Sequence, residues 1–169
     1  MEFFDVVRSR RSVRAYKPDP VPQDKIERIL EAARLAPTAA NRQPFVFYVI
    51  RNKETRLALK AAYSQSWFYE APVIICACAE PAKAWRRSDG RNYADVDTTI
   101  AMDHLILAAA AEGLGTCWIG AFNPAALKKV LDLPEGLDPI AMTPVGFPAD
   151  DAQKPKNRKA ISDFVRFMD

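Results

Sequence analysis

Apolar residues recur at three- and four-residue intervals in several parts of the chain, and this spacing predicts helices. Short repeats of this kind occupy residues 2–9 and 54–62. A longer one begins near Gln23 and ends at Pro37, because proline cannot continue a helix. A further helix is expected from Pro124 onward, with Asn123 at the position where a side chain caps the first turn.

The most apolar helix is expected between about Thr98 and Glu112, with Asp95 or Asp97 as its cap. Apolar side chains occupy nearly every side of this segment, so it should be deeply buried or pack against a second copy of itself. Gly113 follows and can take the left-handed conformation that ends a helix.

Apolar runs without helical spacing predict the strands of a sheet. Residues 45–50 and 73–79 are almost wholly apolar, which is typical of interior strands covered on both faces. Shorter strands are expected at 116–119 and 140–148, and the second of these should leave the sheet at its prolines. The polar residues 81–93 form a loop or lid with a turn at Ser88-Asp89-Gly90.

The composition fits one ordered domain. The chain has 169 residues, of which 49% are hydrophobic and 27% charged, with a net charge of +3. We therefore expect a single domain over 1–169, in which residues 149–169 form a C-terminal arm. No apolar run reaches the roughly 18 residues that cross a membrane, and no signal peptide is indicated. Three cysteines without metal-ligand spacing predict a reducing, cytoplasmic location.

Positive charge is concentrated near the two ends of the chain. Five basic side chains and two serine hydroxyls lie within Arg8–Lys17, and Lys154, Lys156, Arg158 and Lys159 follow late in the sequence. Arginine presents a planar fork of donors that matches phosphate oxygens, so the two clusters could converge on one anion. The alternative interpretation is ordinary solvated charge.

Side chains for acid–base or metal chemistry are scarce. The single histidine, His104, lies in the apolar helix, where a packing role is the more common one. No cysteine–histidine cluster has the spacing of a zinc site, and neither a dinucleotide-binding glycine motif nor a Walker loop is present. Such a chain is either a binding module or an enzyme whose chemistry belongs to a cofactor.

Four motifs, in order along the chain, resemble those of the nitroreductase family, whose members are FMN-dependent NAD(P)H oxidoreductases. They are Ser9-Arg10-Arg11-Ser12-Val13-Arg14, Ala36–Pro44, Gly113–Gly120 and Pro144–Pro148. The resemblance implies an α+β fold with a mostly antiparallel central sheet flanked by helices. It also implies an intertwined homodimer with FMN at the interface. The chemistry would take place at N5 of FMN, with no catalytic side chain and no metal.

The resemblance also assigns cofactor contacts. Arg10, Arg11 and Ser12 match the phosphate and ribityl contacts, and Arg14 matches a basic residue near the pyrimidine edge of the flavin. Lys156 and Arg158 match a C-terminal phosphate contact. The loop that the partner subunit supplies and the segment that faces the flavin near N5 comprise Pro37, Thr38, Ala39, Asn41 and Gln43, and Ile119, Gly120 and Ala121, respectively.

The implied activity is hydride transfer from NADH or NADPH to FMN, followed by reduction of a small electron-poor acceptor such as a nitroaromatic or a quinone, with ping-pong kinetics. The larger members carry a helical insertion over the substrate, and only Tyr63–Tyr69 and Trp85–Tyr93 are available for that role here. No residue in the sequence is placed to choose between the two nucleotides.

Two alternatives stay open. One is another reaction on the same fold, such as dehalogenation, ene reduction or flavin destruction. The other is a non-enzymatic module that binds anions or nucleic acid. The aromatic residues are not interleaved with the basic ones, as a base-stacking surface requires, and this argues against nucleic acid.

Overall fold

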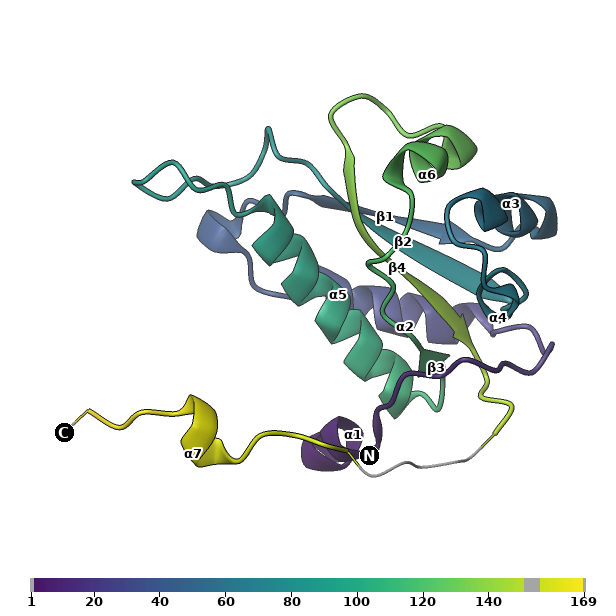
Figure 1. Ribbon diagram of the computed structural model, residues 1–169, viewed down its shortest axis with the longest axis horizontal. Helices are drawn as coiled ribbons and strands as arrows, with labels where there is room; N and C mark the ends of the chain where they lie inside the picture. Colours follow the sequence, from purple (N-terminus) through teal and green to yellow (C-terminus); the bar gives the residue numbers. More distant parts are fainter. Residues whose placement is uncertain (1, 151–155, 169) are drawn as a thin grey trace.

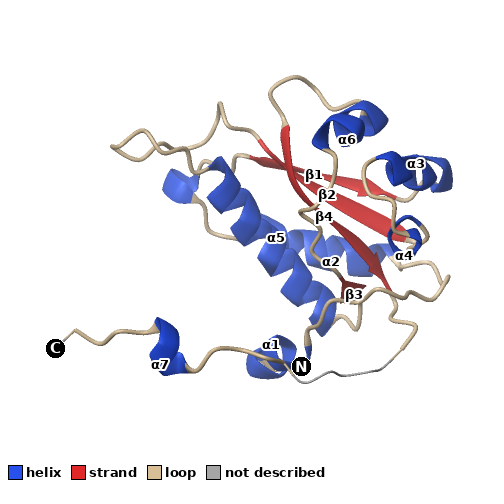
Figure 2. Cartoon of the chain, in the orientation of Figure 1, coloured by secondary structure: helices blue, strands red, loops and turns tan. Residues whose placement is uncertain are grey.

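The computed structural model describes residues 2–150 and 156–168, in which a four-stranded sheet has helices on both faces (Figure 1, Figure 2). The strand order is β1-β2-β4-β3, and each neighbouring pair is antiparallel. The strands are β1 (Phe45–Ile50), β2 (Val73–Ala79), β3 (Gly115–Thr116) and β4 (Asp138–Gly146). This arrangement confirms the predicted α+β fold with an antiparallel central sheet.

The side chains of β2 alternate between two layers of core. Ile75 and Ala77 pack on one face, against α2 (Gln23–Arg34) and α5 (Ala94–Ala111). Ile74 and Cys76 pack on the other face. The helices there are α3 (Lys53–Ala58), η2 (Leu59–Ala61), α4 (Ser66–Tyr69) and α6 (Pro124–Leu131). Because both faces are covered, β2 is completely buried, as its continuous apolar run predicts.

The predicted interior position of β1 was wrong. The strand contacts both core layers, Phe47 on one side and Tyr48 on the other, which accounts for its apolar run. It nevertheless lies at the edge of the sheet, so most of its residues are only half-buried.

β4 runs through Pro144 to Gly146, although the prolines were expected to end it. Ile119 and Met142 exchange two backbone hydrogen bonds, so the backbone nitrogen of Pro144, two residues on, faces the same side. β3 has already ended there at Thr116, and the amide of Cys117 donates to the Thr143 hydroxyl instead. The donor that proline lacks is therefore not needed.

α5 begins at Ala94, earlier than predicted, and neither predicted aspartate caps it. The side chain of Asn92 accepts a hydrogen bond from the Ala94 amide, whereas Asp97 is buried in the first turns of the helix. The predicted cap of α6 is confirmed, because Asn123 accepts a hydrogen bond from Ala126.

Both ends of the chain carry short helices. α1 (Phe3–Ser9) lies near the C-terminal end of α5, and α7 (Ile161–Phe164) belongs to a C-terminal segment that projects away from the sheet (Figure 1). Lys154 and the rest of 151–155 lie outside the described residues. The segment from 156 onward exposes large apolar side chains, with Phe164 66% and Phe167 83% exposed.

Candidate functional site

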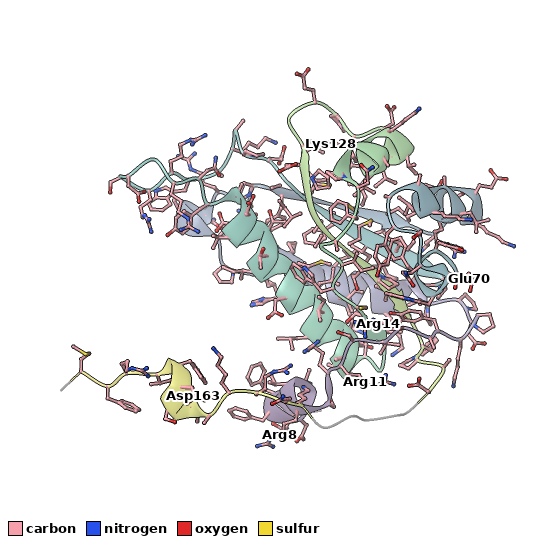
Figure 3. All side chains as sticks on the ribbon, viewed as in Figure 1. Arg8, Arg11, Arg14, Glu70, Lys128 and Asp163 are labelled. Atoms are coloured by element: carbon pink, nitrogen blue, oxygen red, sulfur yellow. The ribbon has the colours of Figure 1, made fainter. Side chains whose placement is uncertain are left out.

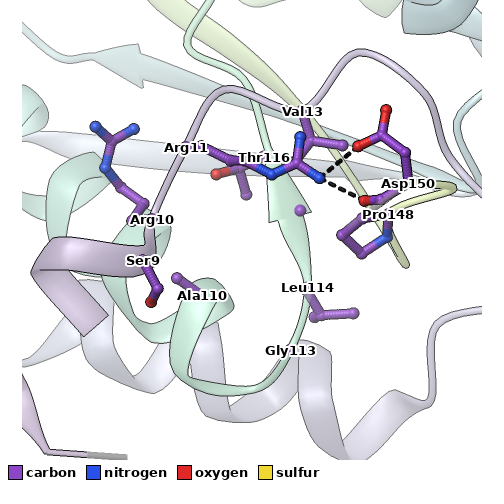
Figure 4. Close-up of a pocket in the computed structure, with 11 residues that line it drawn as sticks. Ser9, Arg10, Arg11, Val13, Ala110, Gly113, Leu114, Thr116, Pro148 and Asp150 are labelled. Carbon is purple, nitrogen blue, oxygen red and sulfur yellow. Dashed lines mark hydrogen bonds and ion pairs between the residues drawn. The ribbon is translucent and has the colours of Figure 1, made fainter. Parts of the chain in front are cut away.

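The basic N-terminal stretch lies along the edge of the sheet and borders a cleft. The amide of Val13 donates to the Thr116 carbonyl at 2.8 Å, and Ser12 pairs with Thr116 in a parallel bridge. Gly115 permits this approach, since a Cβ there would lie 2.8 Å from Cγ2 of Val13. The cleft has a volume of about 400 Å³ (Figure 4). Its lining includes Ser9, Arg10, Arg11, Val13, Gly113–Thr116, Pro148 and Asp150.

Basic side chains from the two ends of the chain meet beside this cleft. Burial lowers the pKa of Lys156, and the nearby positive charges of Arg10 and Arg158 lower it further. Neither Arg10 nor Arg158 has an ion-pair partner in the part of the chain that the structure describes. Three cations near one another and without carboxylates form a site that suits a multiply charged anion.

Arg11 points away from this cluster. Its guanidinium is turned toward Asp150, at 2.6 Å from the carboxylate, while Arg10 extends in a different direction (Figure 4). A ligand phosphate would therefore compete with Asp150 for Arg11, and Arg10 is the freer of the two arginines.

Arg14 lies farther along the same segment, nearer the sheet (Figure 3). It is exposed, and its guanidinium carbon lies 5.9 Å from the ring centroid of Trp67 in α4. Tyr16 fixes the segment beyond it, donating from its hydroxyl to the Val13 carbonyl at 2.6 Å, and burial strongly raises the pKa of Tyr16. An exposed positive charge beside a half-buried tryptophan could face the edge of a planar ligand.

The Pro37–Gln43 loop has an unusual backbone. Ala40, Asn41 and Gln43 have φ angles of 49°, 53° and 49°, a region that residues other than glycine seldom occupy. The hydroxyl of Thr38 accepts a hydrogen bond from the Gln43 amide, and the Gln43 side chain donates to Asn41. Such conformations persist only where the surroundings hold them, and they are common at binding sites.

Asp97 anchors this loop from α5, and its role was not evident from the sequence. Its Oδ1 accepts a hydrogen bond from the Ala39 amide at 3.0 Å. Its Oδ2 is the one buried side-chain nitrogen or oxygen within residues 2–150 and 156–168 that lacks a hydrogen-bond partner. A buried carboxylate with an unused acceptor is costly, so its position beside the loop indicates more than packing. Only the fold brings Asp97 and Ala39 together.

The two groups of predicted residues lie at opposite ends of α5 (Figure 1). The basic cleft borders the C-terminal end of the helix, at Ala110, and the Pro37–Gln43 loop is tied to Asp97 at its N-terminal end. The helix has 18 residues, which corresponds to about 27 Å at 1.5 Å per residue. One chain therefore does not bring both groups around a single small ligand.

The predicted Ile119–Ala121 segment follows β3. Ile119 is buried, and its backbone amide and carbonyl both form hydrogen bonds with the backbone of Met142, whereas Gly120 and Ala121 are exposed. Trp118 is 39% exposed, and its Nε1 is the nearest atom that a Cβ on Gly120 would meet, at 3.8 Å. A backbone without bulky neighbours lets a planar ligand approach closely.

Two other kinds of site find no support in the described part of the chain. No group of three or more metal-ligating side chains occurs among these residues. Nor does any helix described there have the length and hydropathy required to span a bilayer.

The sequence is similar to that of a known protein family and of several named proteins. A family model described as the nitroreductase family matches residues 7–66 and 57–147. A protein of Bacillus subtilis named FMN reductase (NAD(P)H) is 32% identical over 164 residues, which covers 86% of this chain and 66% of that protein. The NADH dehydrogenase of Thermus thermophilus is 30% identical over 181 residues, covering 84% of each.

A crystal structure shows the same fold. It is that of a nitroreductase family protein from Clostridium difficile 630, which is 34% identical and covers 99% of this chain and 98% of its own. The two structures superpose with a TM-score of 0.88. The agreement extends over the whole sheet and its helices.

Proposed function

The chain belongs to the nitroreductase family and is an NAD(P)H-dependent oxidoreductase, and we propose that it holds FMN between two copies of itself. The observation that carries this proposal is that Lys156 donates a hydrogen bond to the Val7 carbonyl and so lies near Arg10, and near Arg158, three cations from both ends of the chain with no ion-pair partner among the described residues. FMN ends in a phosphate that such a cluster would bind.

The residues on the cofactor-binding side of the site have separate roles in this proposal. Arg10, Lys156 and Arg158 hold the phosphate, and Ser12 binds at the adjoining ribityl chain. Arg14 places its charge at the pyrimidine edge, and the exposed backbone at Gly120 lies against the ring. Bound FMN supplies the two-electron redox chemistry that the side chains lack. The protein contributes position, charge and exclusion of water.

A second copy completes the site. Since the Pro37–Gln43 loop and the basic cleft lie at opposite ends of α5, the loop of one chain would face the flavin that the other chain holds. An apolar groove of about 500 Å³ between α1, α2 and α5 supports dimerisation. Its lining includes Phe3, Leu35, His104, Leu107 and Ala111. The exposed apolar side chains of the C-terminal segment suit such a groove on a partner.

We expect one face of the bound flavin to serve the nucleotide and the acceptor in turn. A small, planar, electron-poor molecule, such as a nitroaromatic or a quinone, would occupy the place that the nicotinamide leaves, which predicts ping-pong kinetics. Dehalogenation, ene reduction and flavin destruction stay as alternative reactions at the same site, because no described residue singles out the acceptor.

The three cysteines are buried and free, which supports a reducing compartment such as the cytoplasm.

The flavin itself gives the test. We expect the purified protein to be yellow, or to become so when FMN is added, and expect NADH or NADPH to bleach the colour in the absence of oxygen. Double-reciprocal plots at several acceptor concentrations should give parallel lines. Colourless protein that does not take up added FMN would contradict the proposal, and intersecting lines would contradict the ping-pong order.

A further inference from the structure

The segment from Trp85 to Tyr93 folds back on itself as a short hairpin with one antiparallel bridge between Arg86 and Asn92, here called the 85–93 hairpin. Backbone amides donate from Arg87 to Arg91 at 3.0 Å and from Tyr93 to Trp85 at 3.1 Å. Gly90 has a φ of 88°, the left-handed position that ends a three-residue hairpin turn. The predicted turn at Ser88-Asp89-Gly90 is therefore confirmed, and the side chains on either side of it are held in register.

The register divides the side chains between two faces. Paired residues share a face, and faces alternate along each strand. One face consists of Trp85, Arg87, Arg91 and Tyr93, and the other carries Arg86 and Asn92. On the first face the rings of Trp85 and Tyr93 meet edge to face at 5.0 Å. We call this first face the aromatic face.

One of the two arginines on the aromatic face has no ion-pair partner among the described residues. Arg87 is bound to Asp89 at 2.6 Å and lies over the Tyr93 ring, with 5.9 Å to its centroid. The guanidinium of Arg91, directly opposite, makes no hydrogen bond or ion pair with any residue in 2–150 or 156–168. Like charges opposite each other in a hairpin destabilise it. Asp89 forms its ion pair with Arg87, and it accepts a hydrogen bond only from the backbone amide of Arg91, whose guanidinium attracts it from a longer distance. The face thus combines two aromatic rings with a free arginine.

The 85–93 hairpin stands at the same end of the molecule as the Pro37–Gln43 loop. The amide of Glu80 donates to the Pro44 carbonyl at 2.8 Å, and this bond joins the base of the hairpin segment to the end of the loop. Figure 1 shows the segment between β2 and α5 projecting beyond the N-terminal end of α5, on the side of η1 (Ala39–Asn41). In the proposed dimer it borders the flavin that the partner holds.

We propose that the aromatic face of the 85–93 hairpin binds the adenosine 2′-phosphate end of NADPH, so that this enzyme prefers NADPH to NADH. The inference rests on the proposed function. NADPH differs from NADH by one phosphate monoester, and the fork of Arg91 matches its oxygens. Trp85 and Tyr93 offer apolar edges to the adenine. The sequence alone did not indicate this site, because only the hairpin register separates Arg91 from Arg86.

Arg86 provides a matched control. It lies in the same hairpin and carries the same charge, but it is on the opposite face, and its guanidinium donates a hydrogen bond to the Gly90 carbonyl at 3.4 Å. Arg86→Ala and Arg91→Ala therefore change the net charge equally. Binding of NADP⁺ and of NAD⁺ to the oxidised, FMN-loaded protein is measured by titration calorimetry, and flavin bleaching by NADPH and NADH is measured by anaerobic stopped flow.

We expect NADP⁺ to bind at least about tenfold more tightly than NAD⁺, as a charged hydrogen bond would give. Arg91→Ala should remove about tenfold of the NADP⁺ affinity and leave NAD⁺ unchanged, while Arg86→Ala should change neither by more than about twofold. Equal affinity for both nucleotides, an Arg91→Ala variant like the wild type, or equal losses in the two variants would overturn the inference. If neither nucleotide bleaches the flavin, the proposed function fails instead.

Discussion

At the scale of single residues, the site depends on charges that the protein leaves unpaired. Arg10 and Arg14 have no carboxylate partner among the described residues, whereas Arg8 and Arg11 do. An arginine without an internal partner keeps its donors for a ligand, and its charge then acts on the ligand's own equilibria.

Arg14→Ala is expected to lower the two-electron potential of the bound flavin. A positive charge at the pyrimidine edge favours the more negative, reduced flavin, so its loss should lower the midpoint potential by on the order of 30 mV, a tenfold change in the equilibrium constant. Potentials are measured by anaerobic dye titration, with Arg8→Ala as the control. A potential equal to that of the wild type would remove the role assigned to Arg14.

Asp97→Ala is expected to weaken FMN binding. Without its carboxylate the Ala39 amide loses its partner, and the left-handed conformations at Ala40 and Asn41 lose their support. The dissociation constant for FMN should rise about tenfold, in line with a charged hydrogen bond. Asp103→Ala, an exposed change on the same helix, is the control. If both variants bind FMN like the wild type, Asp97 does not position the loop.

Residue roles were predictable only in part. The arginine cluster and the loop residues were assigned through the motif resemblance. Lys156 and Arg10 lie close enough for their charges to interact, and the convergence of the two basic clusters on one anion stays a prediction. The sequence predicts Asp95 or Asp97 as a helix cap, because a carboxylate near a helix start usually has that role. The true partner of Asp97, Ala39, is 58 residues away, and no local pattern reports such a contact.

At the scale of elements, α5 and α2 are joined by an ionic connection at the end of α5. Glu112 accepts hydrogen bonds from Arg28 at 2.7 Å and from Lys25 at 3.0 Å. These bonds, first from Arg28 and then from Lys25, lower the pKa of Glu112 from 4.5 to about 2. A carboxyl whose pKa is lower in the folded protein stabilises the fold above its unfolded pKa and loses that effect as the pH falls.

Glu112→Gln is therefore expected to change the acid limb of the stability curve. In the wild type the contribution of Glu112 is fully present above about pH 4.5 and is lost as the pH falls toward about 2. Urea midpoints measured over this interval should fall more steeply in the wild type than in the variant, since every other carboxyl is common to both. Parallel curves would show that the ion pairs do not stabilise the fold.

The elements themselves were largely predictable, because apolar spacing reports burial. The errors lie where burial and position in the sheet differ. β1 is apolar on both sides and yet lies at the edge, and β4 continues through Pro144 because its neighbour is short. Strand order and neighbour length follow from tertiary pairing, which single-segment patterns do not contain.

At the scale of the whole molecule, a complete flavin site would require two chains. Most of the large exposed apolar residues lie on or near the groove of α1, α2 and α5 or in the C-terminal segment, and contact with water is unfavourable for both surfaces. The sequence predicts that the apolar helix is deeply buried or packs against a second copy, and that residues 149–169 form an arm. The core position of Ala101, Met102 and Leu105 confirms the burial, and the packing of the arm on a partner stays a prediction.

Phe164→Ser combined with Phe167→Ser is expected to weaken the dimer. Each phenylalanine buried in the partner would contribute on the order of 1.5–3 kcal/mol, so the dimer dissociation constant should rise well over tenfold. Sedimentation velocity measures the change, and bound FMN should be lost in parallel. Leu57→Ser, an exposed apolar change on α3, is the control. A double variant that stays dimeric would show that this segment does not hold the partner.

The central claim, that each flavin site is shared by two chains, is tested most directly by mixing two defective chains. One carries Arg10→Glu in the basic cleft, and the other carries Asn41→Glu in the Pro37–Gln43 loop. Each variant alone should bind FMN poorly, because every site in its dimer has one damaged half. The mixed dimer has one site with both halves intact, so it should bind one FMN per two chains with wild-type affinity. No recovery of FMN binding in the mixed dimer would contradict the shared site.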